Sequence, residues 1–187
     1  YKDWIISKQM FKAKNNFSSN IIEFMDIHSE SYYFLKNKNY HGDSKVIIRS
    51  HTPWTLLRKY YQKKEKKNVD SKWACEREYY CLKKCDAITT PSENLKINLL
   101  NTFNLNQNKI VVLPNIIDTV HFKPLQLKKN NGRFNILHVG RFNRGKGALT
   151  LIKAFIKLAK QYDNIFLINV GKTDTNIYMK CKILLKK

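Results

Sequence analysis

A basic, glycine-rich loop holds the residues of this sequence whose types and spacing could do chemistry. The run HVGRFNRGKG occupies residues 138–147, here called the basic loop, and its cations are Arg141, Arg144 and Lys146. At the start of a helix, such a loop brings backbone N–H groups, the positive end of the helix dipole and cationic side chains to one point. A bound phosphate needs that environment, so we predict a phosphate-binding loop.

Two phosphate-binding patterns fit this loop, and so does a solvated basic turn that binds nothing. Gly140, Gly145 and Lys146 match the G-x-x-x-x-G-K-[ST] pattern of nucleoside triphosphatases. However, Gly147 stands where a Ser or Thr hydroxyl would hold magnesium. The other pattern takes Gly140-Arg141 and Lys146-Gly147 as its fixed points.

The segments beside the basic loop must position it. An apolar run at 134–139 predicts a strand, and apolar residues at helical spacing over 148–162 predict an amphipathic helix. A second apolar run at 165–170 predicts another strand. Residues 123–133 lack periodicity and contain Pro and Gly, which predicts a linker between a first domain, 1–122, and a second, 134–187.

Strands and helices also alternate in the first domain. This alternation predicts an α/β fold with a parallel sheet and helices on both faces. We make no prediction for 1–20, and we expect the lysine-rich segment 63–67 to be an exposed loop or helix end. The expected strands are 21–25, 45–50, 86–90 and 109–113, and the expected helices are 29–40, 70–84 and 92–103.

Polar or turn-forming residues follow the predicted strands. Ligands of parallel α/β sheets bind beyond the carboxyl ends of the strands, so these residues are predicted to line a cleft. They are His51-Thr52-Pro53, Pro91-Ser92, Pro114-Asn115 and Gly140-Arg141.

Composition bounds the class of protein. The chain has 187 residues, 43% of them apolar, as expected for a globular protein. Its net charge of +21 would attract phosphates, nucleic acid and anionic lipids, but the lysines are scattered, which argues against a dedicated nucleic-acid site. Cys75, Cys81, Cys85 and Cys181 lack C-x-x-C spacing, so we expect buried or idle thiols in a reducing cytoplasm and no metal site. No apolar segment has the length of a membrane span, and no signal peptide is visible.

Several blocks, in order along the chain, resemble the GT-B retaining glycosyltransferases of family 4 (glycosyl transferases group 1). The basic loop resembles the donor-phosphate loop of that family. The other blocks are IEFMD (22–26) followed by SESY (29–32), the strand that ends in His51-Thr52-Pro53, Glu78 followed by CDAITTPS (85–92), VLPNIID (112–118) with Phe122, and the strand LINVG (167–171).

The resemblance implies a fold and a reaction. It implies two Rossmann-like domains of the GT-B type, both incomplete in this chain, because the glycine-rich N-terminal strands and the paired glutamates of the family are absent. The reaction would move a hexose from a nucleoside-diphosphate sugar to a glycan or lipid-linked acceptor, with retention of configuration. We expect no metal and no further cofactor. We also expect this chain by itself to be inactive.

The resemblance also assigns residues and a location. His51 would be catalytic, and Gly140, Arg141, Lys146 and Gly147 would bind the donor phosphates. Ser92, Asn115 and Asp118 would serve as caps or hinges. Two positions depart from the family, Ile116 for a glycine and Gly145 for an acidic residue. The protein would work in the cytoplasm, with peripheral contact to anionic lipid at the inner face of the plasma membrane. The alternatives are a P-loop nucleotide-binding protein and a non-catalytic basic protein that binds nucleic acid or anionic membrane.

Overall fold

The computed structural model describes residues 2–61, 69–124 and 132–185. The chain divides into two compact units, Tyr1–Asp118 and Thr119–Lys187, called here the first and second units. Most of the expected linker, residues 125–131, lies outside the described residues, and so does the lysine-rich segment 63–67.

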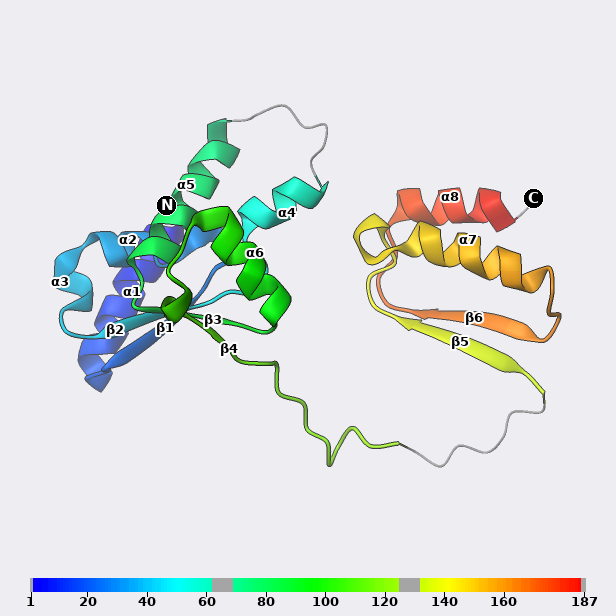
Figure 1. Ribbon diagram of the computed structural model, residues 1–187, viewed down its shortest axis with the longest axis horizontal. Coiled ribbons are helices and arrows are strands. Elements are labelled where there is room, and N and C mark those ends of the chain that lie inside the picture. Colours follow the sequence, from blue (N-terminus) through cyan, green and yellow to red (C-terminus); the bar gives the residue numbers. More distant parts are fainter. Residues whose placement is uncertain (1, 62–68, 125–131, 186–187) are drawn as a thin grey trace. The chain divides into compact units, whose positions relative to one another are not determined.

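A four-stranded parallel sheet forms the centre of the first unit (Figure 1). Its strands are β1 (Ile21–Met25), β2 (Lys45–Arg49), β3 (Ala87–Thr90) and β4 (Ile110–Val112), in spatial order β1-β2-β3-β4. All neighbours pair in parallel, with Phe24 opposite Ile48 and Ile88 opposite Ile110. The structure therefore confirms the parallel sheet, with strand ends within two residues of the predicted ones.

The sheet buries one face. Ile22, Phe24, Val46, Ile48 and Ile88 alternate along the strands and form the core together with helix residues. Residues of the opposite face, such as Ile21, Met25 and Val111, remain exposed. The expectation of helices on both faces is therefore wrong for the described residues, because the buried side chains of the strands all point to the same side.

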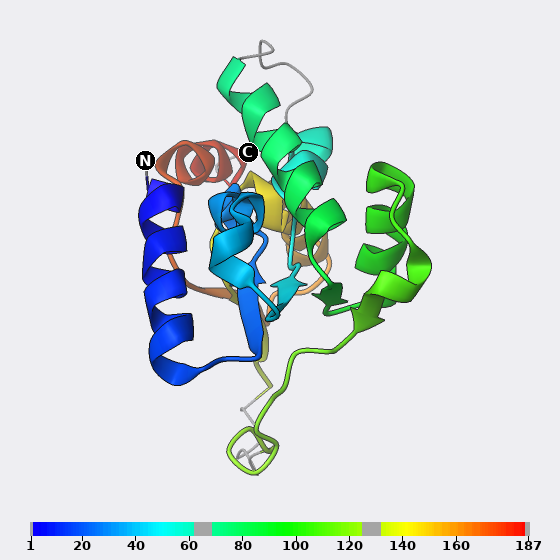
Figure 2. The ribbon, with the colours of Figure 1, turned by 90° about the vertical axis from the view of Figure 1, so that its left-hand side faces the viewer.

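Helices connect these strands. Figure 2 shows α1 toward the β1 end of the sheet and α6 toward the β4 end. The expected helix 29–40 is interrupted, because His28 and Ser29 adopt left-handed backbone angles and Asn37 is extended. The elements are α1 (Lys2–Phe17), the 3-10 turn η1 (Ile27–Ser29), α2 (Tyr32–Lys36), α3 (Lys38–His41), α4 (Trp54–Tyr61), α5 (Val69–Lys84), α6 (Glu93–Phe103) and the 3-10 turn η2 (Gln107–Lys109).

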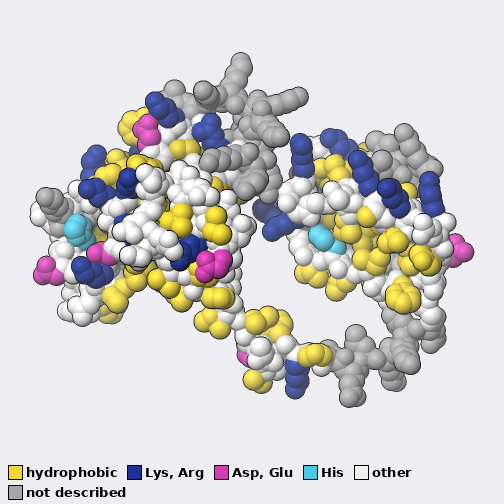
Figure 3. Space-filling view, in the orientation of Figure 1, with side chains coloured by type: hydrophobic (Ala, Val, Ile, Leu, Met, Phe, Trp, Pro, Cys, Tyr) yellow, Lys and Arg dark blue, Asp and Glu magenta, His cyan; other side chains and the backbone are white. Residues whose placement is uncertain are grey.

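The second unit is a strand–helix–strand–helix arrangement. Strands β5 (Phe134–Val139) and β6 (Ile165–Val170) pair in parallel, α7 (Ala148–Ala159) packs on β6, and α8 (Thr175–Leu185) packs against α7. The core consists of Phe142, Ala148, Ile152, Ile177 and Cys181. Tyr162, expected on the apolar helix face, lies beyond the end of α7 and is exposed. Figure 3 shows Lys and Arg side chains along the part of this unit formed by α7 and α8.

Candidate functional site

His51 lies in a loop, Ser50–Pro53, that follows β2 and is called here the His51 loop. The carboxylate of Asp26, just beyond β1, holds it from one side. Asp26 Oδ2 accepts hydrogen bonds from Ser50 Oγ at 2.8 Å, His51 N at 3.1 Å and Thr52 N at 3.2 Å. Desolvation by burial raises the pKa of the Asp26 carboxyl above its usual range, while the hydrogen bonds from Ser50, Thr52 and His51 act to lower it. These contacts fix the backbone of the loop.

A second buried carboxylate holds the other end of the loop, where α4 begins. Glu78 of α5 accepts hydrogen bonds from Trp54 N at 2.6 Å (Oε1) and Thr55 N at 2.9 Å (Oε2). It thereby caps two of the N–H groups that a helix start leaves without intrahelical partners. Glu78 is only 2% exposed, and desolvation by burial raises the pKa of its carboxyl. The loop that carries His51 is therefore anchored at both ends.

Arg49 connects His51 to a second predicted residue, Asn115. Its Nε donates to His51 Nε2 at 3.3 Å, and its Nη2 donates to Asn115 Oδ1 at 3.3 Å. A more distant ion pair, 4.0 Å, joins Nη1 to Glu23 of β1. In this contact His51 Nε2 is the acceptor, which leaves Nδ1 as the protonated nitrogen of a neutral ring. Arg49 therefore orients the imidazole at the carboxyl ends of the strands.

Sequence reasoning named His51 and Asn115 but gave no role to Asp26, Glu78 or Arg49. In the sequence, only the place of Asp26 and Glu78 in blocks that resemble the family could have pointed to them. Carboxylates are seldom fully buried unless hydrogen bonds satisfy them, and both of these carboxylates are buried and hydrogen-bonded.

The other residues predicted as caps or hinges follow β3 and β4 in the chain. Ser92 Oγ accepts from Leu95 N at 3.3 Å and caps α6. Asp118 lies in the irregular segment after β4 and is exposed. Ile116, which stands in place of a family glycine, is 98% exposed, so its side chain displaces nothing in the first unit.

The basic loop of the second unit begins where the backbones of two glycines approach each other closely. Gly140 follows β5 and Gly171 follows β6, both with φ near +140° (144° and 140°). Strand-like pairing continues past them, since Gly140 N donates to Val170 O and Phe142 N to Lys172 O, each at 2.8 Å. Gly140 is thus needed for its backbone conformation, which other residues rarely adopt.

The second half of the loop is a 3-10 turn, η3 (Arg144–Lys146), that leads into α7. Asn143 Oδ1 accepts from Lys146 N at 3.0 Å and caps this turn. Gly147 then adopts a left-handed conformation, φ 75°, immediately before Ala148 starts the helix. Lys146 is therefore held within two residues of the α7 N-terminus. Sequence reasoning missed the capping role of Asn143.

The two predicted phosphate-binding cations are available to a ligand. Arg141 and Lys146 are both exposed. Across the described residues, neither side chain forms an ion pair with an acid. The triphosphatase pattern is disfavoured by the backbone, because a Ser or Thr in place of Gly147 would need a left-handed conformation that residues other than glycine rarely adopt.

No group of three or more His, Cys, Asp or Glu side chains able to hold a metal ion is found in the described ranges. Burial raises the pKa of the Cys81 thiol to about 12 and that of Cys85 to about 11, which disfavours the thiolate form. None of the described helices is both long and apolar enough to cross a membrane.

The family model described as Glycosyltransferase Family 4 matches residues 9–121, more than half of the sequence. The chain belongs to glycosyltransferase family 4. This confirms the resemblance read from the sequence blocks and places the His51 loop inside the matched region.

A crystal structure of a glycosyltransferase from Rickettsia africae ESF-5 is similar to this family 4 chain, with a TM-score of 0.50 and 15% sequence identity. The similarity covers 89% of this chain and 50% of that one, so the present chain spans about half of its length. At this identity the likeness shows the fold, and it confirms the Rossmann-like GT-B class. No curated protein sequence matches the chain.

Proposed function

We propose that the protein transfers a hexose from a nucleoside-diphosphate sugar to a hydroxyl group of a glycan or lipid-linked acceptor, with retention of anomeric configuration. A bond forms between the acceptor oxygen and the anomeric carbon, and the bond from that carbon to the diphosphate breaks. The diphosphate leaves with the electron pair, and the proton that the acceptor hydroxyl loses passes to the leaving diphosphate. The observation that carries this proposal is the pair of exposed cations, Arg141 and Lys146, beside the N-terminus of α7 in a family 4 chain.

The proposed role of these cations is to stabilise the charge that grows on the leaving diphosphate. Arg141 offers a planar fork of N–H donors, and Lys146 offers a point charge. The first turn of α7 adds N–H groups and the positive end of its dipole. Interactions that strengthen as charge develops lower the barrier, and no metal cofactor is invoked in this proposal.

His51 is the proposed catalytic residue of the first unit. Its main chain is held by Asp26, and its ring is oriented by Arg49. We propose that its Nδ1–H faces the donor sugar or the point of attack, because Nε2 is engaged by Arg49. Gly140 and Gly147 supply the backbone shape of the basic loop, and Ser92, Asn115 and Asp118 are proposed to be structural.

The proposed site of action is the cytoplasmic face of the plasma membrane, with peripheral contact to anionic lipid. Residues 119–187 contain 15 Lys or Arg and two Asp or Glu. Such an excess attracts anionic headgroups at low ionic strength. Sedimentation with vesicles of anionic phospholipid at low and high salt tests this contact, and equal binding to neutral vesicles would contradict it.

The central test is turnover of the full-length protein with a panel of nucleoside-diphosphate sugars. We expect Arg141→Ala and Lys146→Ala each to lower turnover by about a hundredfold. Arg144→Ala is the matched control in the same loop, with an expected loss of less than about threefold. Unchanged turnover in both Arg141→Ala and Lys146→Ala would disprove the phosphate-binding role.

A further inference from the structure

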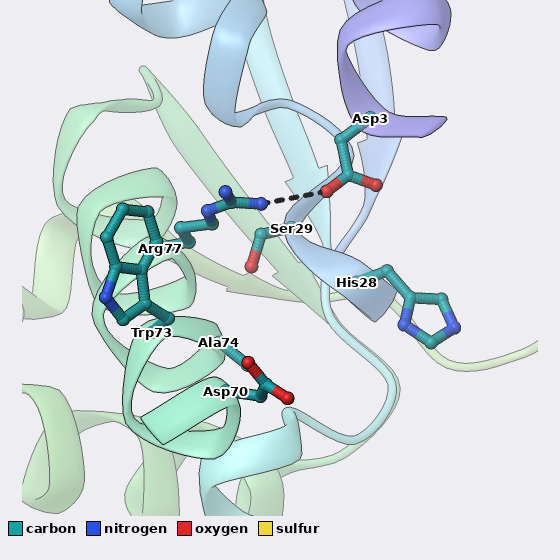
Figure 4. A pocket seen from close by; sticks show the side chains of 7 residues that line it. All are labelled: Asp3, His28, Ser29, Asp70, Trp73, Ala74 and Arg77. Atoms are coloured by element: carbon teal, nitrogen blue, oxygen red, sulfur yellow. Dashed lines mark hydrogen bonds and ion pairs between the residues drawn. The ribbon is translucent and has the colours of Figure 1, made fainter. Parts of the chain in front are cut away.

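Arg77 of α5 contacts groups from two other helices of the first unit. Its Nη1 lies 3.2 Å from Oδ2 of Asp3 in α1, and the dashed line in Figure 4 marks this ion pair. Its Nη2 donates a hydrogen bond to the hydroxyl of Tyr33 in α2 at 3.3 Å. The guanidinium carbon also lies 5.2 Å from the ring centre of Tyr32 and 5.4 Å from that of Trp73. Arg77 thereby joins α5 to α1 and α2 through charge-assisted hydrogen bonds and cation–π contacts.

The ion pair between Arg77 and Asp3 is largely shielded from water. Only 23% of the Arg77 side chain and 17% of the Asp3 side chain are exposed. Arg77 Nε is buried and has no hydrogen-bond acceptor among the residues that the structure describes. Removing charges and an N–H group from water costs free energy, and apolar residues of similar volume often stabilise a fold equally well. Stability alone therefore does not account for a cation at this place.

Arg77 directly precedes Glu78, the carboxylate that holds the start of α4. Successive residues of a helix point about 100° apart, so the two side chains leave α5 toward different neighbours. Arg77 reaches α1 and α2, whereas Glu78 accepts hydrogen bonds from Trp54 N at 2.6 Å and Thr55 N at 2.9 Å. A shift of α5 by about 1 Å away from α4 would take both bonds beyond the ordinary limit of about 3.2 Å. The contacts of Arg77 oppose such a shift, because they fix the residue next to Glu78.

The other anchor of the His51 loop also borders α5. Ser29 follows Asp26 by three positions in the turn η1, and it lines the same pocket as Arg77 (Figure 4). Cys81 Sγ, one turn after Arg77 in α5, lies 4.0 Å from Ser29 O. Asp26 in turn accepts the hydrogen bond from His51 N. A displacement of α5 would therefore disturb the surroundings of both anchors.

We propose that Arg77 is a positioning residue for His51. It fixes α5 at the place from which the Glu78 carboxylate holds the start of α4, and it does so through Asp3 and Tyr33. Arg77 itself touches no substrate in this proposal. Its expected effect on turnover rests on the proposed function, whereas its effect on the course of the His51 loop does not.

Amide hydrogen exchange in the full chain tests this positioning without requiring turnover. Arg77→Met keeps an unbranched apolar stem but removes the guanidinium, and Asp3→Asn leaves Arg77 in place but removes its charged partner. We expect exchange at the N–H groups of Trp54 and Thr55 to become about tenfold faster in Arg77→Met. In Asp3→Asn, the milder variant, it should become about threefold faster, and this variant decides if Arg77→Met does not fold.

Leu99→Ala is the matched control for a general loss of stability. Leu99 is fully buried in α6, and its truncation destabilises the core of the same unit. It should leave exchange at Trp54 and Thr55 within about twofold of the wild type. Faster exchange in Arg77→Met that Leu99→Ala does not share supports the proposal. Unchanged exchange in Arg77→Met, or equal acceleration by Leu99→Ala, overturns it.

Turnover of the full-length protein tests whether Arg77 acts through Glu78. Arg77→Met by itself should lower turnover by about tenfold. It should leave the affinity for nucleoside diphosphates unchanged, since Arg141 and Lys146 lie in the second unit. In a Glu78→Ala background, the same change should lower turnover by less than about twofold further, because the connection is already broken. Losses that simply add would show that Arg77 does not act through Glu78.

The two measurements separate this proposal from the proposed function. If the wild type transfers no sugar from any nucleoside-diphosphate sugar, the proposed function fails, and hydrogen exchange still decides whether Arg77 positions the loop. If turnover is present but exchange at Trp54 and Thr55 does not respond to Arg77→Met, the positioning proposal fails and the proposed function stands.

Discussion

A Cβ atom on Gly171 would lie 2.1 Å from the carbonyl oxygen of Gly140. The two glycines cross where β5 and β6 end, and the basic loop starts at that crossing. Because the obstructing atom belongs to the backbone, a side chain at Gly171 must push the loop aside.

Gly171→Ala is therefore expected to cost about 3 kcal/mol in the free energy of unfolding and to weaken nucleotide binding. Urea unfolding and nucleotide titration measure the two effects. Gly132→Ala is the matched control, because Gly132 also has a positive φ, 74°, but nothing lies within 4 Å of an added Cβ. It should cost about 1 kcal/mol and leave nucleotide binding unchanged. Equal costs for the two variants would contradict the proposed crowding.

The raised pKa of Asp26 predicts how stability depends on pH. The folded protein holds this proton more tightly than the unfolded chain does. The contribution of Asp26 to the free energy of unfolding is therefore largest below the ordinary pKa of 3.8, and it falls as the pH rises through the raised pKa. Asp26→Asn keeps an acceptor oxygen and cannot titrate.

We expect wild-type stability to fall relative to Asp26→Asn as the pH rises from below 3.8 into the weakly acidic range. Urea unfolding at a series of pH values measures the difference. A difference that is flat, or that changes in the opposite direction, would show that the carboxyl is not desolvated as described.

Glu78 is expected to stabilise the start of α4. Glu78→Ala leaves two backbone N–H groups, those of Trp54 and Thr55, without their acceptors, and it should cost about 2–3 kcal/mol. Glu76→Ala on the same helix removes only an exposed pair with Lys72 and should cost less than about 0.5 kcal/mol. Chemical unfolding compares the two, and similar costs would rule out the capping role.

Arg49 is predicted to be a positioning residue for His51. Arg49→Lys keeps the charge, but a single ammonium group lacks the fork that serves His51 Nε2 and Asn115 Oδ1 together. We expect about a tenfold loss of turnover. We also expect a change in the tautomer of His51, which imidazole nitrogen NMR measures. Arg144→Lys is the control, and its spectrum and turnover should match the wild type. A tenfold loss without any change in the His51 spectrum would exclude positioning as the cause.

Local pattern predicted most of the sheet and the basic loop. Apolar runs that end at Pro53, Pro91 and Pro114 fall on β2, β3 and β4, because proline cannot continue the pairing. The order Gly140, Lys146, Gly147 marked the turn into α7 for a similar reason, since glycine supplies the backbone conformations needed there. Family blocks added His51 and its neighbours.

What could not be predicted depends on contacts between distant segments. Helix α1 has no clear apolar period, and its Ile6, Met10 and Phe11 are only partly buried against the core. The bond from Arg49 to Asn115 spans 66 positions, and the three bonds to Asp26 span 24 to 26. Periodicity describes neighbours along the chain, so it carries no information on such pairs.

The anchoring of the His51 loop has a consequence for how this protein can vary. Asp26 and Glu78 grip mainly backbone N–H groups, those of His51, Thr52, Trp54 and Thr55. Every residue except proline carries such a group, whatever its side chain. Apart from His51, whose ring has the proposed catalytic role, side chains at these positions can thus be exchanged while the main chain keeps its course, which makes Thr52, Trp54 and Thr55 natural positions to diversify in a library.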